Sequence, residues 1–204
     1  MLKELNPNIK YIALHHFGGT IVNRWYETQN FTERQIENAH SSRWDFPSKL
    51  NGSNIGYNVI VYPDGEYRQY RYVGEETAAQ VGYNNNALSI CLAGNFTLRN
   101  GKPVETPTPA QINTLTSLLI YSYLTYKVPL ANIKPHRAFK HSWTECYGTA
   151  LDDNWGRKLL VPYLKKRLGY LKTLLNLYMK LLSLYDKIKP HRFGGFGKNC
   201  VGHV

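Results

Sequence analysis

Short apolar runs separated by turn residues predict the strands of this chain. Residues 9–16 (IKYIALHH) and 87–96 (ALSICLAGNF) are almost continuously apolar, which is typical of strands buried inside a sheet. In residues 55–73, apolar and polar positions alternate on both sides of Pro63-Asp64-Gly65. Alternation around such a turn predicts a β-hairpin.

Two other stretches have helical spacing. In residues 32–44 (TERQIENAHSSRW) Thr32 is suited to be the N-cap. Residues 108–128 (TPAQINTLTSLLIYSYLTYKV) predict a longer helix, with Thr108 or Thr106 near the cap and Pro109 in the first turn. Strands interleaved with helices predict an α/β domain, a mixed central sheet flanked by helices, over residues 1–163.

The pattern changes after this domain. Leucines and tyrosines recur at alternating steps of four and three, which predicts an amphipathic helix over residues 164–189. The seam consists of Leu164, Leu168, Leu171, Leu175, Tyr178, Leu182 and Tyr185. Pro190 ends this helix, and residues 190–204 form a glycine-rich tail that we expect to be flexible.

Composition narrows the class of protein. A hydrophobic fraction of 43% with 13% aromatic residues, in a chain of 204 residues, indicates a packed globular protein. The N-terminal residues lack the apolar core of a signal peptide, and no run approaches the length of a membrane span. Three widely spaced cysteines, Cys91, Cys146 and Cys200, form no disulfide framework.

The net charge of +11 is concentrated at the C-terminal end. Residues 164–204 contain nine Lys or Arg and one acidic residue, Asp186, so they contribute +8 and the rest of the chain +3. A basic segment of this kind either has an anionic partner or serves solubility. The chain contains no nucleic-acid recognition motif, so we expect no nucleic-acid partner.

Two adjacent histidines, His15 and His16, follow the first apolar run. Successive side chains of a strand point to opposite faces, so at most one of the pair serves a given site. A catalytic zinc site takes three protein ligands and leaves a position open for water. The further candidate ligands are His136, His141 and Cys146 in the late loop.

Five motifs, in this order, resemble those of zinc-dependent N-acetylmuramoyl-L-alanine amidases of the peptidoglycan-recognition-protein and phage-endolysin superfamily. They are LHHFGG, NIGYNVIVYPDG, GYNNNALSICLAGNF, TPAQINTLTSLL and KPHR followed by TECYG. The resemblance spans roughly residues 9–160. It implies a mixed central sheet flanked by helices, with zinc at the floor of an open groove.

The resemblance also implies roles for individual residues. It makes His15, His136 and Cys146 the ligands of Zn2+, and it turns His16 away toward the core. It gives catalytic roles to Tyr57 and Thr144. Tyr57 would donate a hydrogen bond to the developing oxyanion or assist the leaving amine, and Thr144 would add a hydrogen bond to the same oxygen.

Further residues match positions that contact substrate in the family, or could line the groove. These are His40, Arg71, Tyr83, Asn84 and His141.

The sequence also departs from the family pattern. The interval from His136 to Cys146 is ten residues, longer than usual, so we expect a bulged loop in which His141 is a rival ligand or a substrate contact. Cys91 stands where some relatives carry a glutamate usable as a general base. The general base is left open, with Glu145 near the site in sequence.

The resemblance implies a peptidoglycan hydrolase that cleaves the amide between N-acetylmuramic acid and the L-alanine of the stem peptide. Without a signal peptide, it would be an endolysin held in the host cytoplasm until release to the cell wall. The alternative is a non-catalytic peptidoglycan-recognition protein, a class that usually lacks the cysteine ligand. For the C-terminal helix three roles stay open: binding to anionic wall polymers or a membrane surface, self-association, or packing back on the domain.

Overall fold

The computed structural model describes the chain apart from residues 1, 6, 19, 22–23, 26 and 189–204. The chain divides into two compact units, Met1–Pro162 and Tyr163–Val204. The assignment of 1–163, 164–189 and 190–204 as separate domains stays a prediction, and the glycine-rich tail lies outside the described residues. Within these residues, no helix is both long enough and apolar enough to cross a bilayer.

A five-stranded sheet in the order β5-β4-β6-β1-β9 forms the centre of the first unit. Its strands are β1 (Tyr11–His16), β4 (Val59–Val61), β5 (Tyr67–Gln69), β6 (Ala87–Leu92) and β9 (Ile133–Pro135). β1 pairs in parallel with β6 and β9, β4 pairs in parallel with β6, and β4 and β5 form the antiparallel hairpin. The predicted fold class, a mixed sheet flanked by helices, is confirmed.

Continuous apolar sequence explains why β1 and β6 lie at the centre of the sheet. All six residues of β6 and five of the six in β1 are buried, as expected for strands covered on both faces. On one face, Ile36 packs with Ile60 and Cys91 in one apolar cluster. On the other face of β1, Leu14 lies against Gly156, where an added Cβ would be 2.4 Å from the leucine Cδ1.

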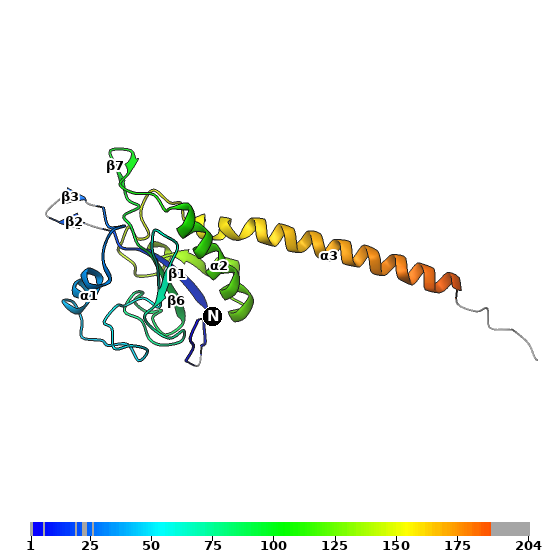
Figure 1. The fold of residues 1–204 in the computed structure, drawn as a ribbon, viewed down its shortest axis with the longest axis horizontal. Helices are drawn as coiled ribbons and strands as arrows, with labels where there is room; N and C mark the ends of the chain where they lie inside the picture. Colours follow the sequence, from blue (N-terminus) through cyan, green and yellow to red (C-terminus); the bar gives the residue numbers. More distant parts are fainter. Residues whose placement is uncertain (1, 6, 19, 22–23, 26, 189–204) are drawn as a thin grey trace, which may run out of the picture. The chain divides into compact units, whose positions relative to one another are not determined.

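Two helices begin with the caps that the sequence predicts. α1 (Glu33–Ser41) and α2 (Pro109–Tyr126) start after Thr32 and Thr108, and each threonine forms a capping box with the glutamine three residues later. The side-chain amide of Gln111 in α2 donates to the carbonyls of Val61 and Ala93, at 3.1 and 2.8 Å, which ties this helix to the sheet. α1 and α2 lie on either side of β1 and β6 (Figure 1).

Several short elements were not predicted from the sequence. They are β9 and the ribbons β2 (Thr20–Ile21) with β3 (Arg24–Trp25) and β7 (Leu98–Arg99) with β8 (Lys102–Pro103), together with the 3-10 turns η1 (Leu130–Asn132) and η2 (His136–Ala138). Apart from β9, they lie outside the central sheet.

The last helix begins earlier than the sequence indicated. α3 (Trp155–Ile188) starts nine residues before Leu164 and contains Pro162 within it. Its first turns belong to the first unit, where Arg157 Nε donates to the carbonyl of Ile133 at 3.0 Å and Leu160 is fully buried.

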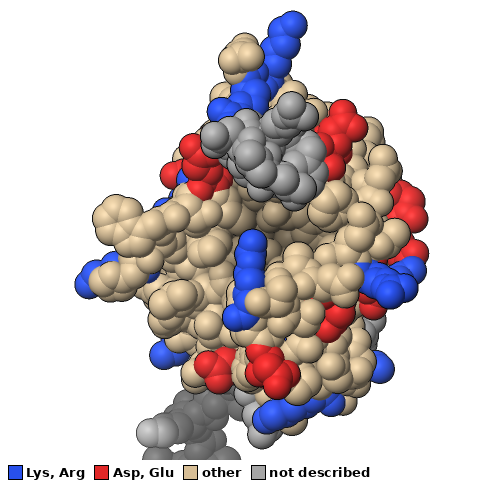
Figure 2. Space-filling view, turned by 90° about the vertical axis from the view of Figure 1, so that its left-hand side faces the viewer, with Lys and Arg blue, Asp and Glu red and all other residues tan. Residues whose placement is uncertain are grey.

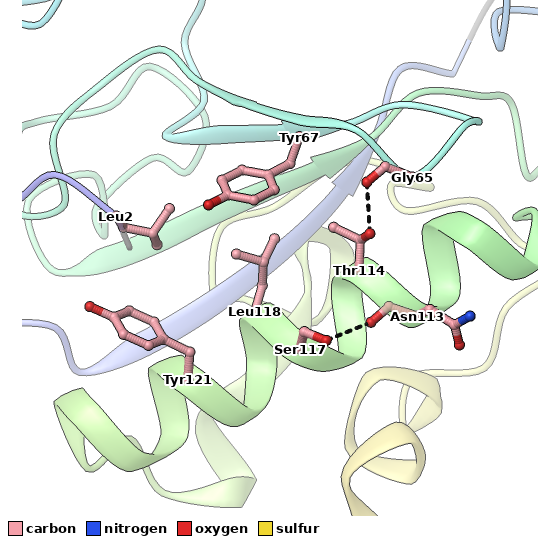
Figure 3. Close-up of a pocket in the computed structure, with 8 residues that line it drawn as sticks. All are labelled: Leu2, Gly65, Tyr67, Asn113, Thr114, Ser117, Leu118 and Tyr121. Carbon is pink, nitrogen blue, oxygen red and sulfur yellow. Dashed lines mark hydrogen bonds between the residues drawn. The ribbon is translucent and has the colours of Figure 1, made fainter.

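A groove of about 460 Å3 lies beside α2 in the first unit. Figure 3 shows Thr114 Oγ1 donating to the carbonyl of Gly65 at 2.7 Å across its floor. The residues that line it are Leu2, Gly65, Tyr67, Asn113, Thr114, Ser117, Leu118 and Tyr121. None of these is a histidine, a cysteine or an acid, so the groove offers no metal ligands of the kind that the motifs contain.

Candidate metal centre

Parallel pairing of neighbouring strands brings two histidines together. β9 ends at Pro135, which is in register with Leu14 of β1, so the next residue of each strand, His136 and His15, emerges at the same edge of the sheet. Their ring centroids are 4.8 Å apart. The Sγ of Cys146 lies 3.7 Å from His15 Nδ1, and one ligand atom from each of the three residues lies within 4.8 Å of the others.

A partly buried arginine, Arg137, organises the loop that carries Cys146. The backbone N–H of Arg137 donates to the carbonyl of Cys146 at 2.7 Å. Its guanidinium donates to the carbonyls of Gly148 and Leu151 at 2.7 and 2.5 Å, and to Asp153 Oδ1 at 2.8 Å. These bonds close the loop between η2 and α3 and thereby fix Cys146 beside the histidines.

Gly148 lets the same loop approach the core closely. Its φ is +92°, a conformation that favours glycine, and an added Cβ would lie 2.3 Å from the carbonyl oxygen of Phe96. The backbone N–H of Ala150 donates to that carbonyl at 2.9 Å. A side chain at position 148 would therefore push the ligand loop away from the sheet.

Burial keeps both candidate histidine ligands neutral. It holds the pKa of His15 well below its ordinary value, with a smaller contribution from His136, and it lowers the pKa of His136 to about 4. Burial also raises the pKa of Cys146 to about 12, which the His16 backbone N–H and the charge of Arg137 oppose. Neutral imidazoles present the free lone pairs that a metal ion requires.

The spacing of these atoms fits a metal ion. Donor atoms about 2.0–2.3 Å from a tetrahedral zinc lie roughly 3.3–3.8 Å apart. The 3.7 Å between Cys146 Sγ and His15 Nδ1 falls in that range, and the 4.8 Å limit for the whole group requires only a small contraction. Two imidazoles and a thiol are also a donor set that zinc prefers.

His16 points away from this group, as the alternation of a strand requires. Its Nδ1 accepts a hydrogen bond from the backbone N–H of Phe96 at 3.1 Å, and burial lowers its pKa to about 3. Its own backbone N–H donates to Cys146 Sγ at 3.4 Å. A donor aimed at this sulfur stabilises a thiolate, so the backbone of His16 supports the cysteine while its ring supports the core.

Tyr57 lies between two histidines. Its ring centroid is 5.1 Å from that of His15 and 5.2 Å from that of His40. Burial, with smaller contributions from Cys91 and Cys146, raises the pKa of Tyr57 well above its ordinary value, so the phenol keeps its proton. Cys91 is fully buried and in register with His15 on the neighbouring strand.

His40 is buried at the end of α1, where its Nδ1 accepts a hydrogen bond from the backbone N–H of Gly56 at 3.1 Å. The contact with Tyr57 makes it a neighbour of the site. The Gly56 bond fixes the orientation of its ring.

Two more predicted residues belong to the ligand loop. Thr144 is exposed, and its Oγ1 accepts from the backbone N–H of Cys146 at 3.1 Å, which leaves its own hydroxyl hydrogen free to donate elsewhere. His141 is exposed, with a φ of +66°, and the structure does not bring it into the group of ligand atoms.

Tyr83 and Asn84 take part in packing and loop structure. The ring of Tyr83 packs edge-on against Tyr11 and Phe139, at 5.1 and 4.9 Å. Asn84 Oδ1 accepts hydrogen bonds from the backbone N–H groups of Ala79 and Gln80. Both side chains remain partly exposed.

Arg71, which was expected to contact substrate, lies inside the fold in this structure. Its side chain is fully buried and pairs with Glu75 at 3.4 Å. It also donates to the carbonyls of Ile55, at 2.8 Å, and Phe46, and lies over the Phe46 ring. An arginine with all these partners holds the segment around Phe46 onto the hairpin and cannot reach a ligand.

Sequence reasoning missed two residues near the ligand loop. Arg137 follows a candidate ligand directly, but its acceptors are main-chain carbonyls that no sequence pattern reveals. Trp143 lies within the loop and is 98% exposed. A tryptophan three residues before a candidate ligand is visible in the sequence, but its exposure is apparent only in the structure.

The side of the first unit toward which β1 runs is shown in Figure 2. Its centre is hollowed and formed mainly by uncharged residues, crossed by a basic side chain, whereas acidic and other basic side chains gather toward the rim. Since His15 and His16 end β1, the candidate ligands lie toward this side.

Solved structures share this fold. One is the N-acetylmuramoyl-L-alanine amidase LysC from Clostridium intestinale, with a TM-score of 0.57, 22% identity, and coverage of 80% of this chain and 97% of that one. Another is the Drosophila peptidoglycan recognition protein SA, with a TM-score of 0.53, 19% identity, and coverage of 74% and 79%. The chain therefore has the fold of these two proteins.

Sequence comparison narrows this fold to a family. Residues 5–149 match the model of the N-acetylmuramoyl-L-alanine amidase family, so the chain belongs to that family. The endolysin of Klebsiella phage KP32 is 32% identical over 73 residues, which are 36% of this chain and 48% of that protein. The match thus spans about half the length of this curated relative.

Proposed function

We propose that this chain is a peptidoglycan hydrolase of the endolysin type, which cleaves the amide between N-acetylmuramic acid and the L-alanine of the stem peptide. The observation that supports this most strongly is the convergence of His15, His136 and Cys146 at one edge of the sheet in a member of the amidase family.

The three residues would hold Zn2+, which supplies Lewis acidity and an activated water for amide hydrolysis when bound. His15 and His136 offer neutral imidazoles, and Cys146 a sulfur that accepts from the His16 backbone. The backbone N–H of Phe96 fixes the ring of His16, and that of Arg137 fixes the loop that carries Cys146.

The remaining residues would orient the substrate and stabilise charge. Tyr57 keeps its phenol proton at neutral pH and would donate it as a hydrogen bond to the oxyanion that forms at the scissile carbonyl. Thr144 would donate a second hydrogen bond with the hydroxyl hydrogen that its contact to Cys146 leaves free. The exposed ring of Trp143 would pack against the sugar or stem peptide beside the cleaved bond.

A non-catalytic recognition protein is the competing function, because the Drosophila protein with this fold is a recognition protein by name. Digestion of purified peptidoglycan, followed by analysis of the new ends, separates the two. The proposal predicts new L-alanine amino termini, absent with Cys146→Ser. New reducing sugar ends would instead indicate a glycosidase, and tight binding without new ends would indicate a recognition protein.

A further inference from the structure

The second unit exposes an unusual amount of apolar surface along one helix. We call residues 163–184 of α3 the exposed helix segment. Eleven of its large apolar side chains are between 39% and 65% exposed in the described part of the chain. They are Leu168, Tyr170, Leu171, Leu174, Leu175, Leu177, Tyr178, Met179, Leu181, Leu182 and Leu184. A patch of this extent marks an interaction surface.

The side chains of the exposed helix segment separate into two sectors. At 3.6 residues per turn, the apolar side chains cover more than half of the circumference. The polar sector is narrow and consists of Lys165, Lys172, Thr173, Asn176, Lys180 and Ser183. Lys166 lies at its border, and Arg167 is the one charge inside the apolar sector.

The charges of the segment all have one sign. Between residues 155 and 184 the helix contains no Asp or Glu. The cations of the exposed helix segment are Lys165, Lys166, Arg167, Lys172 and Lys180. A surface that fits this segment is therefore anionic where it meets the lysines and apolar where it meets the leucines.

A second copy of the chain does not fit this charge pattern. If Leu168, Leu171 and Leu175 formed a coiled-coil seam, the positions beside the seam would include Lys165, Arg167 and Lys172. Opposite charges at these positions select the partner in coiled coils. Two copies would instead place lysine and arginine against each other, in parallel or antiparallel pairing, and would leave most of the wide apolar sector uncovered.

An anionic wall polymer would match only the polar sector of the segment. It would neutralise the lysines but would leave the leucines in water. An anionic bilayer surface satisfies both sectors, because apolar side chains enter the acyl boundary while lysines reach the headgroups. The helix is not long and apolar enough to cross the bilayer, so it would lie in the surface.

We propose that the exposed helix segment binds the surface of membranes rich in anionic phospholipid, lying in the plane of the membrane. This binding is separate from the hydrolase chemistry of the first unit and concerns where the protein is held. Over 22 residues the segment is about 33 Å long, so it would contact several lipids at once.

Vesicle flotation of the full chain tests the proposal. We would use vesicles of phosphatidylcholine alone and vesicles in which one quarter of the lipid is phosphatidylglycerol. The test variant is Leu171→Gln with Leu175→Gln, at the centre of the apolar sector. The matched control is Thr173→Gln with Asn176→Gln, on the polar sector, and both double variants preserve the net charge. Circular dichroism verifies that both remain helical.

The proposal predicts that the native chain floats with anionic vesicles, and that high salt weakens this binding. It predicts that the apolar double variant loses about tenfold or more of its partition coefficient while the polar control changes little. Absence of native flotation, or equal loss in both variants, would overturn it. A lipid-free dimer or larger oligomer that the apolar variant dissociates, without vesicle binding, would assign the surface to a second copy. Because hydrolysis of soluble muropeptides is measured separately on the same samples, failure of this proposal is distinguishable from failure of the hydrolase.

Discussion

Replacing Arg137 by methionine would remove the guanidinium that holds the ligand loop while preserving most of the apolar stem. In the native protein this group donates to the carbonyls of Gly148 and Leu151, at 2.7 and 2.5 Å, and to the carboxylate of Asp153. The side chain is only 20% exposed. Its loss removes the shorter of the two hydrogen bonds to the Gly148 carbonyl, which also accepts from the Leu151 backbone N–H at 3.4 Å, and it removes the guanidinium donor of the Leu151 carbonyl. The segment that carries Cys146 is then held less firmly.

The expected loss in free energy of unfolding follows from how deeply each hydrogen-bond partner of Arg137 is buried. The Asp153 carboxylate is 56% exposed, so its ion pair with Arg137 contributes about 1 kcal/mol or less. The two short bonds to carbonyls are charge-assisted, and such bonds contribute about 1.5–3 kcal/mol each when fully buried. Allowing for partial exposure, we expect Arg137→Met to lower the free energy of unfolding by about 2–4 kcal/mol.

The assay is denaturant unfolding in the presence of a chelator, so that bound metal does not add to the measured stability. Arg68→Met is the matched control, because Arg68 is half exposed and pairs with Glu33 and Glu66 on the surface. Competition with a chromophoric chelator then measures zinc affinity, which we expect to fall about 10–100-fold in Arg137→Met only. Equal stability and equal zinc affinity in the two variants would refute the role assigned to Arg137.

Three further substitutions test neighbouring parts of the site. Gly148→Ala places a Cβ against the Phe96 carbonyl at a φ of +92°, so we expect a loss of about 2 kcal/mol or more in thermal or denaturant unfolding; native stability would contradict the close approach. Tyr57→Phe should retain zinc but lose about 10²–10³-fold in kcat, measured on soluble muropeptides, and unchanged kcat would exclude the oxyanion role. Trp143→Ala should weaken binding to insoluble peptidoglycan, measured by co-sedimentation, without changing zinc content, since the exposed indole contacts no ligand atom; unchanged binding would remove Trp143 from the substrate surface.

Local signals were sufficient to predict most of the central elements. Thr32 and Thr108 cap their helices through contacts that span three residues, which a sequence pattern records directly. β1 and β6 were predictable because their apolar runs match strands buried on both faces. β9 was missed because it has three residues and ends in proline, although its pairing with β1 is what positions His136.

Tertiary contacts explain what the sequence could not predict. Arg71 has the pattern of a strand-end arginine in solvent, and only the fold reveals that Ile55, Phe46 and Glu75 surround it. The start of α3 at Trp155 was not predicted because Pro162 lies within the helix, and proline is unfavourable in a helix interior. The ordered motifs anticipated the three candidate ligands, but the loop contacts of Arg137 come from residues with no periodic pattern.

Metal analysis of the purified chain tests the central claim most directly. We would measure zinc per chain by mass spectrometry for the native protein, Cys146→Ser and Cys91→Ser, after dialysis against a trace of free zinc. Cys91 is the matched control, because it is a buried cysteine beside Tyr57 but outside the group of ligand atoms. The account predicts one zinc per chain in the native protein and in Cys91→Ser, and none or little in Cys146→Ser. Equal zinc in all three proteins, or none in the native chain, would contradict it.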